Sequence, residues 1–247
     1  MLRILKSMFF ITFTFISGIL VGLASLIFFW APAHVLWKFV NNYCRLTLWA
    51  GEFFCDLKVT VEGEDNLPMT ASVIMIKHSS ALETYGHVPF FPKTTWVLKR
   101  EILWIPFFGW ALKFVFQPIA INRSGGGSAV KQIIEQGKKK LADGIWVTIF
   151  PEGTRMLPGE TRKYGISGAA LARETGVLIV PVAHNAGDFW QRRKITKRPG
   201  VVRFCIGPAI DASSQSPEET NLLVQNWIEN KMYEISSVYQ NVAKEIR

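Results

Sequence analysis

The sequence predicts an α/β fold, a mixed sheet flanked by helices, with an N-terminal membrane-embedded two-helix motif. Short apolar runs alternate with helical patterns from residue 57 onward, and near-continuous apolar strands are typical of a sheet covered on both faces. The longest uncharged stretch lies at the start of the chain. The 247 residues also combine 49% hydrophobic residues with a net charge of +9, which favours a membrane surface.

The first helix is expected in residues 8–31, which carry no charge and follow Arg3 and Lys6. As a helix this stretch is roughly 36 Å long, enough to cross a hydrocarbon core of about 30 Å. A cleaved signal peptide is the rival interpretation, because Ala31-Pro32-Ala33 weakly resembles a cleavage site. Against it, the apolar run exceeds the usual ~7–15 residues and a proline lies inside the site. Gly18 and Gly22 form a GxxxG pattern, which indicates either helix contact or chance spacing.

A second helix is expected over residues 35–54, where apolar residues recur at helical spacing among polar ones. This pattern fits a helix that lies in the membrane interface, one that packs back on the first helix, or an ordinary amphipathic core helix. We therefore divide the chain into residues 1–56, a membrane-anchoring helical hairpin, and residues 57–247, an α/β domain with a C-terminal helical tail.

The α/β part is assigned from hydrophobic runs and turn residues. Strands are expected at Leu57–Glu62 and at residues 71–76, 119–122, 145–150, 177–182 and 201–206, and helices at residues 129–141, 166–175 and 218–244.

Several classes of protein are excluded by composition. The apolar content excludes intrinsic disorder, and three widely spaced cysteines exclude a disulfide-stapled miniprotein. No Cys/His cluster has zinc spacing, so neither a metal nor a cofactor is expected. Nucleic-acid binding is suggested only by net charge and by the basic clusters at residues 138–140 and 192–194, without a recognition motif.

The first candidate site is His78 with Glu83, which follow the apolar run at residues 71–76. If the chain turns into a helix between them, Glu83 accepts a hydrogen bond from the imidazole Nδ1 and leaves Nε2 as a general base. The alternative is a capping box, in which Glu83 only bonds the backbone N–H of Ser80.

The second candidate site is the segment Phe-Pro-Glu-Gly-Thr-Arg at residues 150–155, which begins with the last residue of the run at residues 145–150. Gly153 permits a sharp turn, Thr154 offers a hydroxyl, and Arg155 carries a guanidinium suited to phosphate. Arg123 follows another strand and supplies a second cation. The alternative is a plain strand-to-loop turn with a surface arginine. No nucleophile elbow is present, so the pattern fits direct acyl transfer to the hydroxyl of a phosphate-bearing lipid.

These motifs, in this order, resemble the lysophosphatidate acyltransferase (1-acyl-sn-glycerol-3-phosphate O-acyltransferase) family of bacterial type. The family's His-x4-Asp block is matched by His78 and Glu83, with Glu in place of Asp, and its Phe-Pro-Glu-Gly-Thr-Arg block is matched in full. An arginine after an apolar strand is matched by Arg123, and a strand ending in proline by residues 177–181. The resemblance covers roughly residues 57–211.

The resemblance implies a role for each matched residue. His78 is the general base and Glu83 orients it. Arg123 and Arg155 hold the phosphate of the acceptor. The remaining candidates for substrate binding are Glu152, Gly153 and Thr154, which shape the glycerol site, and Lys99 and Arg100, for the phosphate or the acidic carrier of the donor. The acyl group is expected to move from acyl-CoA or acyl-carrier protein to the sn-2 hydroxyl of lysophosphatidate, giving phosphatidate.

The charges near the N-terminus favour a cytoplasmic start of the chain. A single complete span would then place His78 outside the cell, away from acyl thioesters. A hairpin that turns near Pro32 returns the chain to the cytoplasmic face. We therefore expect a protein of the bacterial inner (cytoplasmic) membrane, in contact with anionic lipids and with its catalytic domain facing the cytoplasm.

Three other interpretations stay open at this point. Two concern the acceptor, glycerol 3-phosphate or a lyso-aminolipid, because the same blocks serve those reactions. The third is a non-catalytic membrane scaffold of the same fold. Nucleic acid is not expected as a partner.

Overall fold

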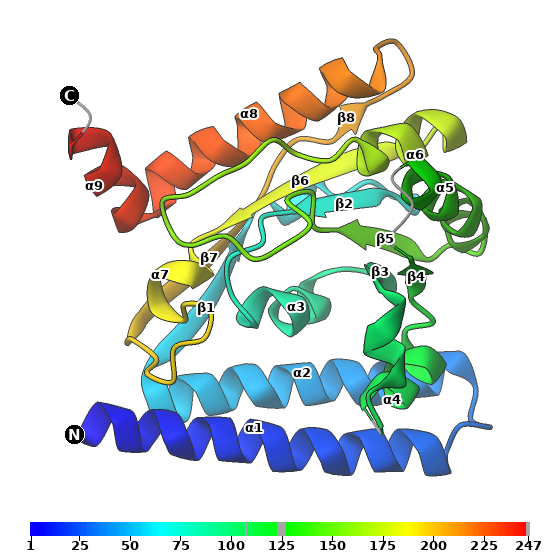
Figure 1. The fold of residues 1–247 in the computed structure, drawn as a ribbon. Coiled ribbons are helices and arrows are strands. Elements are labelled where there is room, and N and C mark those ends of the chain that lie inside the picture. The colour runs from blue at the N-terminus through cyan, green and yellow to red at the C-terminus, as the bar shows by residue number, and fades with distance from the viewer. Residues whose placement is uncertain (107, 123–126, 246–247) are drawn as a thin grey trace.

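The computed structural model describes residues 1–106, 108–122 and 127–245. The described residues form an eight-stranded mixed sheet with helices on both faces (Figure 1). The strands are β1 (Leu57–Glu62), β2 (Val73–Ile76), β3 (Thr94–Lys99), β4 (Ile119–Ile121), β5 (Trp146–Ile149), β6 (Leu178–His184), β7 (Gly200–Ile206) and β8 (Ile210–Asp211). The helices are α1 (Leu2–Ile27), α2 (Ala33–Cys55), α3 (Leu82–Gly86), α4 (Phe108–Val115), α5 (Gly127–Ala142), α6 (Ser167–Thr175), α7 (Ala186–Phe189), α8 (Pro217–Ile235) and α9 (Ser237–Glu245). Short 3-10 turns occupy Glu64–Asn66, Val88–Phe90 and Arg100–Trp104.

The strand order is β1-β7-β6-β2-β5-β3-β4, with β8 beside β6. The pairs of β2 with β5 and β6, of β3 with β4 and β5, and of β1 with β7 are parallel, whereas β6 pairs antiparallel with β7 and β8. The sheet is therefore mixed, as the sequence predicts. The carboxyl ends of the central strands β2, β5 and β3 meet at one edge, where functional groups of such sheets are usually found.

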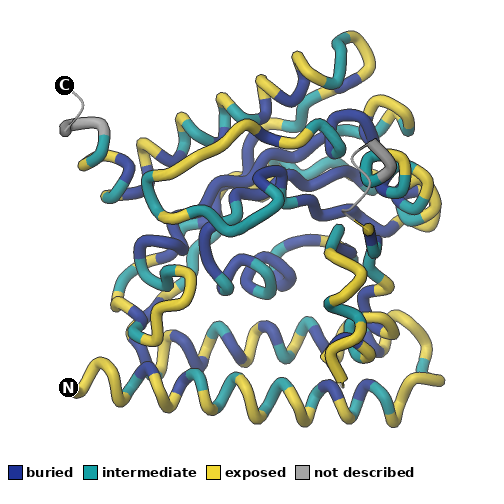
Figure 2. The backbone as a smooth tube through the Cα atoms, in the orientation of Figure 1, coloured by how far each residue is buried: buried dark blue, intermediate teal, exposed yellow. Residues whose placement is uncertain are grey.

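Both faces of the central strands are buried, which explains their continuous apolar runs. In β2, Val73 and Met75 face the cluster that contains α5, α6 and α8, and Ile74 and Ile76 face the opposite cluster, which contains Phe10 of α1. Figure 2 shows the sheet as the most deeply buried layer. Each residue of β2 thus adds to one of two cores, and helices cover them.

The two N-terminal helices form an antiparallel hairpin beneath the sheet, with α3 between them and the strands (Figure 1). The Tyr43 hydroxyl donates to the carbonyl of Thr14 at 2.9 Å, and it lies where a Cβ on Gly18 would meet it at 3.0 Å. The second helix therefore packs back on the first, and one glycine of the GxxxG pattern contributes to that contact. The division of the chain at residues 56 and 57 stays a prediction.

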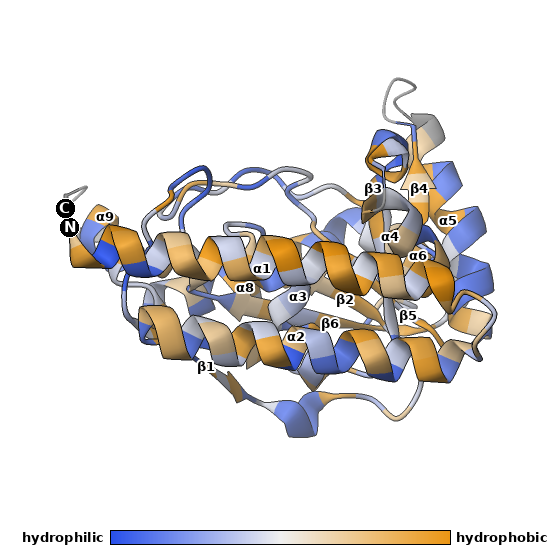
Figure 3. Cartoon of the chain, turned by 90° about the horizontal axis from the view of Figure 1, so that it is seen from below, coloured by the Kyte–Doolittle hydropathy of each residue, from blue (hydrophilic) through white to orange (hydrophobic). Residues whose placement is uncertain are grey.

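The hairpin leaves a large apolar surface exposed, and by length and composition α1 is able to cross a membrane. We call this surface the base face; Figure 3 views it from below. Its exposed side chains include Phe9, Phe15, Ile16 and Leu20 of α1, Phe39, Leu46, Trp49 and Phe53 of α2, and Trp110 and Phe114 of α4. Apolar patches of this extent mark interaction with a membrane or another protein.

The structure adds elements that the hydrophobic pattern did not predict. The strand β3 begins with Thr94 and Thr95, whose hydroxyls are buried and bonded to Thr148 Oγ1 at 2.7 Å and to the Phe116 carbonyl at 2.6 Å. Polar residues whose hydrogen bonds are made inside the sheet interrupt the apolar run, so a search for apolar runs does not find this strand. The predicted C-terminal helical tail is confirmed and consists of two helices, which meet at Ser236, whose hydroxyl donates to the buried Asp188 carboxylate at 2.9 Å.

Candidate active site

The predicted pair of His78 and Glu83 is formed. His78 lies just past β2, and Glu83 lies in the first turn of α3. The distance from Nδ1 of His78 to Oε1 of Glu83 is 2.7 Å, and the same oxygen accepts the backbone N–H of Ser80 at 3.1 Å. The orienting contact and the capping contact therefore coexist, since one carboxylate oxygen serves both.

The Glu83 carboxylate is fully buried and remains ionised. Burial alone favours the neutral acid, but the hydrogen bond from His78, together with the charge of Arg155, holds the pKa of Glu83 below its ordinary value. An ionised partner fixes the proton of His78 on Nδ1. The other ring nitrogen, Nε2, is then the basic one.

The ring of His78 is held in place from a second side. It stacks on Phe150 with ring centroids 4.1 Å apart and an interplanar angle of 28°, while its side chain retains 14% exposure. Its backbone carbonyl accepts the N–H of Met156 at 2.8 Å. The imidazole is therefore oriented by protein contacts and still open to a substrate on one side.

Two further histidines surround Glu83, but both are buried and neutral. His184 Nε2 donates to the Lys77 carbonyl at 2.6 Å, and its Nδ1 accepts the N–H of Ala186 at 3.3 Å. Burial lowers the pKa of His184, so its approach to Glu83 at 3.9 Å is not an ion pair. His87 donates from Nδ1 to the Glu83 carbonyl at 2.6 Å, and burial lowers its pKa to about 4.

Glu152 occupies a position that its motif alone does not reveal. The side chain is buried, with Oε2 accepting the backbone N–H of His78 at 2.9 Å and Oε1 lying 2.8 Å from Lys77 Nζ. Burial raises the pKa of Glu152 to about 7, although Lys77 opposes this rise. The carboxylate thus positions the backbone of His78, and its predicted contact with the glycerol of a substrate stays a prediction.

Lys77 is the centre of a buried polar network that joins the site to the C-terminal helices. Its ammonium also lies 2.7 Å from Oε1 of Glu229 in α8, and that oxygen accepts the Tyr164 hydroxyl at 2.7 Å. Burial disfavours the charged lysine, but Glu152, Tyr239 and Glu229 raise the pKa of Lys77 above its ordinary value. Lys77 is therefore charged, and both carboxylates depend on it.

Arg155 is a cation close enough to the His78–Glu83 pair to act on Glu83, and it has no ion-pair partner among the described residues. Its Nε atom is buried and finds no hydrogen-bond partner among the described residues, and its charge acts on Glu83. Gly153 has a φ of 67°, which permits the sharp turn that the sequence predicts there. Thr154, between them, is half-buried.

Three other residues, Lys99, Arg100 and Arg123, were predicted to bind substrate. Lys99 ends β3 and Arg100 begins the following turn, both exposed, at the edge of the sheet where β2 and β5 also end. Arg123 lies outside the described residues. Among the side chains that the structure describes, no three His, Cys, Asp or Glu residues form a group able to hold a metal ion.

Sequence reasoning missed Lys77, His87, His184 and Glu229 as members of the site's surroundings. The sequence offered an indication for Lys77, because a lysine that directly follows a buried apolar strand needs a partner if it is buried too. Glu229 carried none, since it lies 152 residues further along the chain and only the packing of α8 brings it to Lys77.

Comparison with known proteins agrees with this geometry. A family model described as Acyltransferase matches residues 58–185, which include both catalytic blocks. A 1-acyl-sn-glycerol-3-phosphate acyltransferase of Pseudomonas aeruginosa is 40% identical over 216 residues, covering 86% of this chain and 84% of that protein. The chain belongs to this acyltransferase family. It is accordingly an enzyme, which excludes the scaffold interpretation.

Other members of the acyltransferase family are more distant. The 1-acyl-sn-glycerol-3-phosphate acyltransferase of Borreliella burgdorferi is 28% identical over 198 residues, covering 76% of this chain and 75% of its own. The crystal structure of the acyltransferase PlsC from Thermotoga maritima superposes with a TM-score of 0.78 over 94% of this chain and 95% of that chain, at 20% identity. That similarity confirms the fold.

Proposed function

We propose that this enzyme transfers a fatty acyl group from an acyl thioester to the sn-2 hydroxyl of lysophosphatidate, giving phosphatidate. The observation that carries the proposal is the hydrogen-bonded His78–Glu83 pair, in which the His78 side chain is 14% exposed, together with Arg155, whose buried Nε has no hydrogen-bond partner among the described residues. The names of the relatives support the acceptor, since they act on 1-acyl-sn-glycerol 3-phosphate.

In this mechanism Nε2 of His78 takes the proton of the acceptor hydroxyl as that oxygen attacks the thioester carbonyl carbon. A C–O bond forms, the tetrahedral intermediate collapses, and the C–S bond breaks. The imidazolium then returns the proton to the leaving thiolate, so that an ester and a free thiol result. The buried Glu83 carboxylate stabilises the imidazolium, and the step as written uses no cofactor.

Arg155 is proposed to hold the phosphate of the acceptor. Its guanidinium offers paired donors that match two phosphate oxygens. Among the described residues its Nε has no hydrogen-bond partner, so binding a phosphate breaks no hydrogen bond of that atom. Arg123, Lys99, Arg100 and the turn at Gly153 and Thr154 remain further candidates for substrate contacts.

The test uses the purified full-length protein with lysophosphatidate and either acyl-CoA or acyl-carrier protein. We expect His78→Ala to lower kcat by about 10²–10⁴-fold, the usual contribution of a placed general base. The matched control is His34→Ala, an exposed histidine at the start of α2, which is expected to keep full activity. Full activity in His78→Ala would refute the catalytic assignment, and preference for glycerol 3-phosphate or a lyso-aminolipid would change the acceptor.

The base face is proposed to attach the enzyme to one leaflet of the bacterial inner membrane, with the domain in the cytoplasm. Contacts with α2, α4 and the α/β domain follow α1 from Phe10, which packs against Trp190, to the turn after the helix, where Phe29 packs against Phe114 of α4. A bilayer crossed by α1 would therefore enclose part of the polar domain, at high cost. A reporter fused after Arg247 is expected to behave as cytoplasmic, and a periplasmic signal would overturn this topology.

A further inference from the structure

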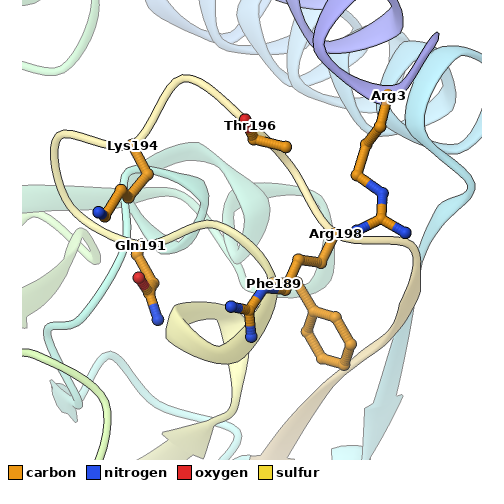
Figure 4. Close-up of a pocket in the computed structure, with 6 residues that line it drawn as sticks. All are labelled: Arg3, Phe189, Gln191, Lys194, Thr196 and Arg198. Carbon is orange, nitrogen blue, oxygen red and sulfur yellow. The ribbon is translucent and has the colours of Figure 1, made fainter. Parts of the chain in front are cut away.

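Two adjoining hollows lie where the start of α1 meets the loop of residues 190–199. The first, of about 300 Å³, is drawn in Figure 4 and is lined by Arg3, Phe189, Gln191, Lys194, Thr196 and Arg198. The second, of about 310 Å³, shares Arg3 and is lined also by Leu2, Lys6, Ser7, Cys55, Asp56, Lys197 and Pro199. We call them together the paired hollow. None of the residues of the candidate active site lines it.

The paired hollow is strongly basic. Five of its lining side chains are cations: Arg3, Lys6, Lys194, Lys197 and Arg198. The carboxylate that lines it, Asp56, is already paired with Lys6 at 3.1 Å. Among the residues that the structure describes, the other four cations have no ion-pair partner. The paired hollow therefore has the charge of a site for an anion.

Lys197 gives the second, independent indication of an anionic ligand. This residue is only 2% exposed, and its ammonium bonds the carbonyl oxygens of Lys194 at 3.3 Å and Ile195 at 2.8 Å and lies 4.4 Å from the ring of Trp190. Burial lowers its pKa to about 8, because no carboxylate compensates the charge. A buried ammonium without a counter-charge is costly, and an anion in the adjoining hollow would supply that charge.

The walls of the paired hollow are held in place before any ligand arrives. The backbone N–H of Lys197 donates to the Ser7 hydroxyl of α1 at 2.9 Å. The N–H groups of Arg198 and Gly200 donate to the carbonyls of Phe189 and Asp56, both at 2.9 Å. These bonds fix the backbone from which the lining cations extend, although the side chains of Arg3, Lys194 and Arg198 are themselves exposed, and a fixed backbone reduces the entropy lost on binding.

The position of the paired hollow indicates the kind of anion. Exposed apolar side chains belong to the same segments: Leu2 lines the paired hollow, and Leu5 and Ile195 are the chain neighbours of the lining residues Lys6 and Lys194. Cations next to apolar groups at the edge of a membrane-facing surface match a lipid headgroup above its acyl chains. We propose that the paired hollow binds the phosphate of an anionic glycerophospholipid as a second lipid site, separate from acyl transfer. The proposal rests on the proposed membrane attachment of the base face.

The experiment measures binding of short-chain phosphatidylglycerol to the detergent-purified full-length enzyme, from the rise of the unfolding temperature with lipid concentration. The test variant is Arg3→Gln/Lys194→Gln/Arg198→Gln. The control variant, Lys131→Gln/Lys138→Gln/Lys139→Gln, removes the same charge from α5 at the other end of the molecule (Figure 1). We expect the test variant to bind phosphatidylglycerol about tenfold more weakly, from lost charge-assisted hydrogen bonds, and the control to bind it as the wild type does.

Short-chain phosphatidylcholine and inorganic phosphate distinguish the possible sources of the phosphate. We expect neither to reproduce the stabilisation by phosphatidylglycerol at equal concentration. Equal weakening of the test and control variants, or no weakening of either, would overturn the proposal. An equal effect of inorganic phosphate would show a site for free phosphate and would also overturn it.

Lys197→Met separates a ligand-binding lysine from a structural one. Without lipid we expect its unfolding temperature to equal or exceed that of the wild type, because an uncompensated buried charge is removed. Its stabilisation by phosphatidylglycerol should be smaller. A loss of stability that is the same with and without lipid would overturn the proposal. Acyl transfer measured on the same samples tests the proposed function separately, since loss of transfer in the wild type leaves the lipid-binding result unaffected.

Discussion

Removal of the Lys77 ammonium is expected to destabilise the enzyme far more than removal of any surface lysine. The ammonium lies 2.8 Å from Glu152 and 2.7 Å from Glu229, with side-chain exposures of 1%, 0% and 12% for the three residues. In Lys77→Met the two carboxylates face each other across an apolar side chain. Breaking a buried ion pair in this way costs about 3–5 kcal/mol, because the remaining charge is left without compensation.

The expected effect is large enough for a simple measurement. In a chain of this size 1 kcal/mol corresponds to about 2–4 °C of unfolding temperature, so Lys77→Met is expected to unfold about 6–20 °C below the wild type in the same detergent. The control is Lys138→Met. Lys138 pairs with Glu174 at 3.2 Å, but both side chains are about half exposed, and such pairs contribute about 0–1 kcal/mol.

A second variant shows whether the loss comes from the uncompensated carboxylate. The double change Lys77→Met/Glu152→Gln removes one of the two stranded charges and is expected to recover part of the lost stability, with kcat still reduced because Glu152 positions the His78 backbone. A fall of less than about 1 kcal/mol in Lys77→Met, or no recovery in the double variant, would refute the reasoning.

Three further predictions concern the site and the membrane surface. Glu83→Gln keeps the size of the side chain but removes the charge that stabilises the imidazolium. We expect kcat to fall at least about tenfold and the unfolding temperature to change little. An unchanged kcat would contradict the assigned role of Glu83. His87 is neutral in the fold, because burial lowers its pKa to about 4 from 6.5 when exposed, so its contribution to stability is lost as pH falls from about 6.5 to 4. We therefore expect the difference in stability between the wild type and His87→Gln to change with pH across that window. A difference independent of pH would contradict the assignment. Trp49→Ser/Phe53→Ser removes two exposed, stacked rings of the base face. We expect more of this variant than of the wild type to stay in the soluble fraction after sedimentation with vesicles, while its specific activity in mixed micelles is unchanged. Unchanged sedimentation would place the membrane contact elsewhere.

The sequence was most informative where chemistry is local. The run at residues 71–76 predicted a buried strand, and His78 with Glu83 predicted an orienting contact five residues apart, which the structure confirms at 2.7 Å. Of the capping interpretation one hydrogen bond is present, from the Ser80 N–H to the same carboxylate oxygen, but α3 has Ala81 as its N-cap and no side-chain cap, so the capping box itself is not formed. Short-range patterns suffice here, since the turn from β2 into α3 depends on neighbouring residues.

The strand β3 and the break at Ser236 were not predicted, for a common reason. Thr94, Thr95 and Ser236 are polar side chains whose hydroxyls are bonded inside the fold to partners that are distant in the sequence. A pattern of apolar runs does not include such residues. Only the packed arrangement of the chain shows that their burial is compensated.

By itself the sequence determined the α/β class, the apolar hairpin at the start of the chain, and the two motifs that carry the chemistry. These features depend on the periodicity and identity of adjacent residues. Only the tertiary structure decided that Glu152 is directed to Lys77 and the backbone of His78, and that Glu229 completes that network from 152 residues away. The physical reason is that charge compensation in a core acts over a few ångströms of space, whatever the separation along the chain.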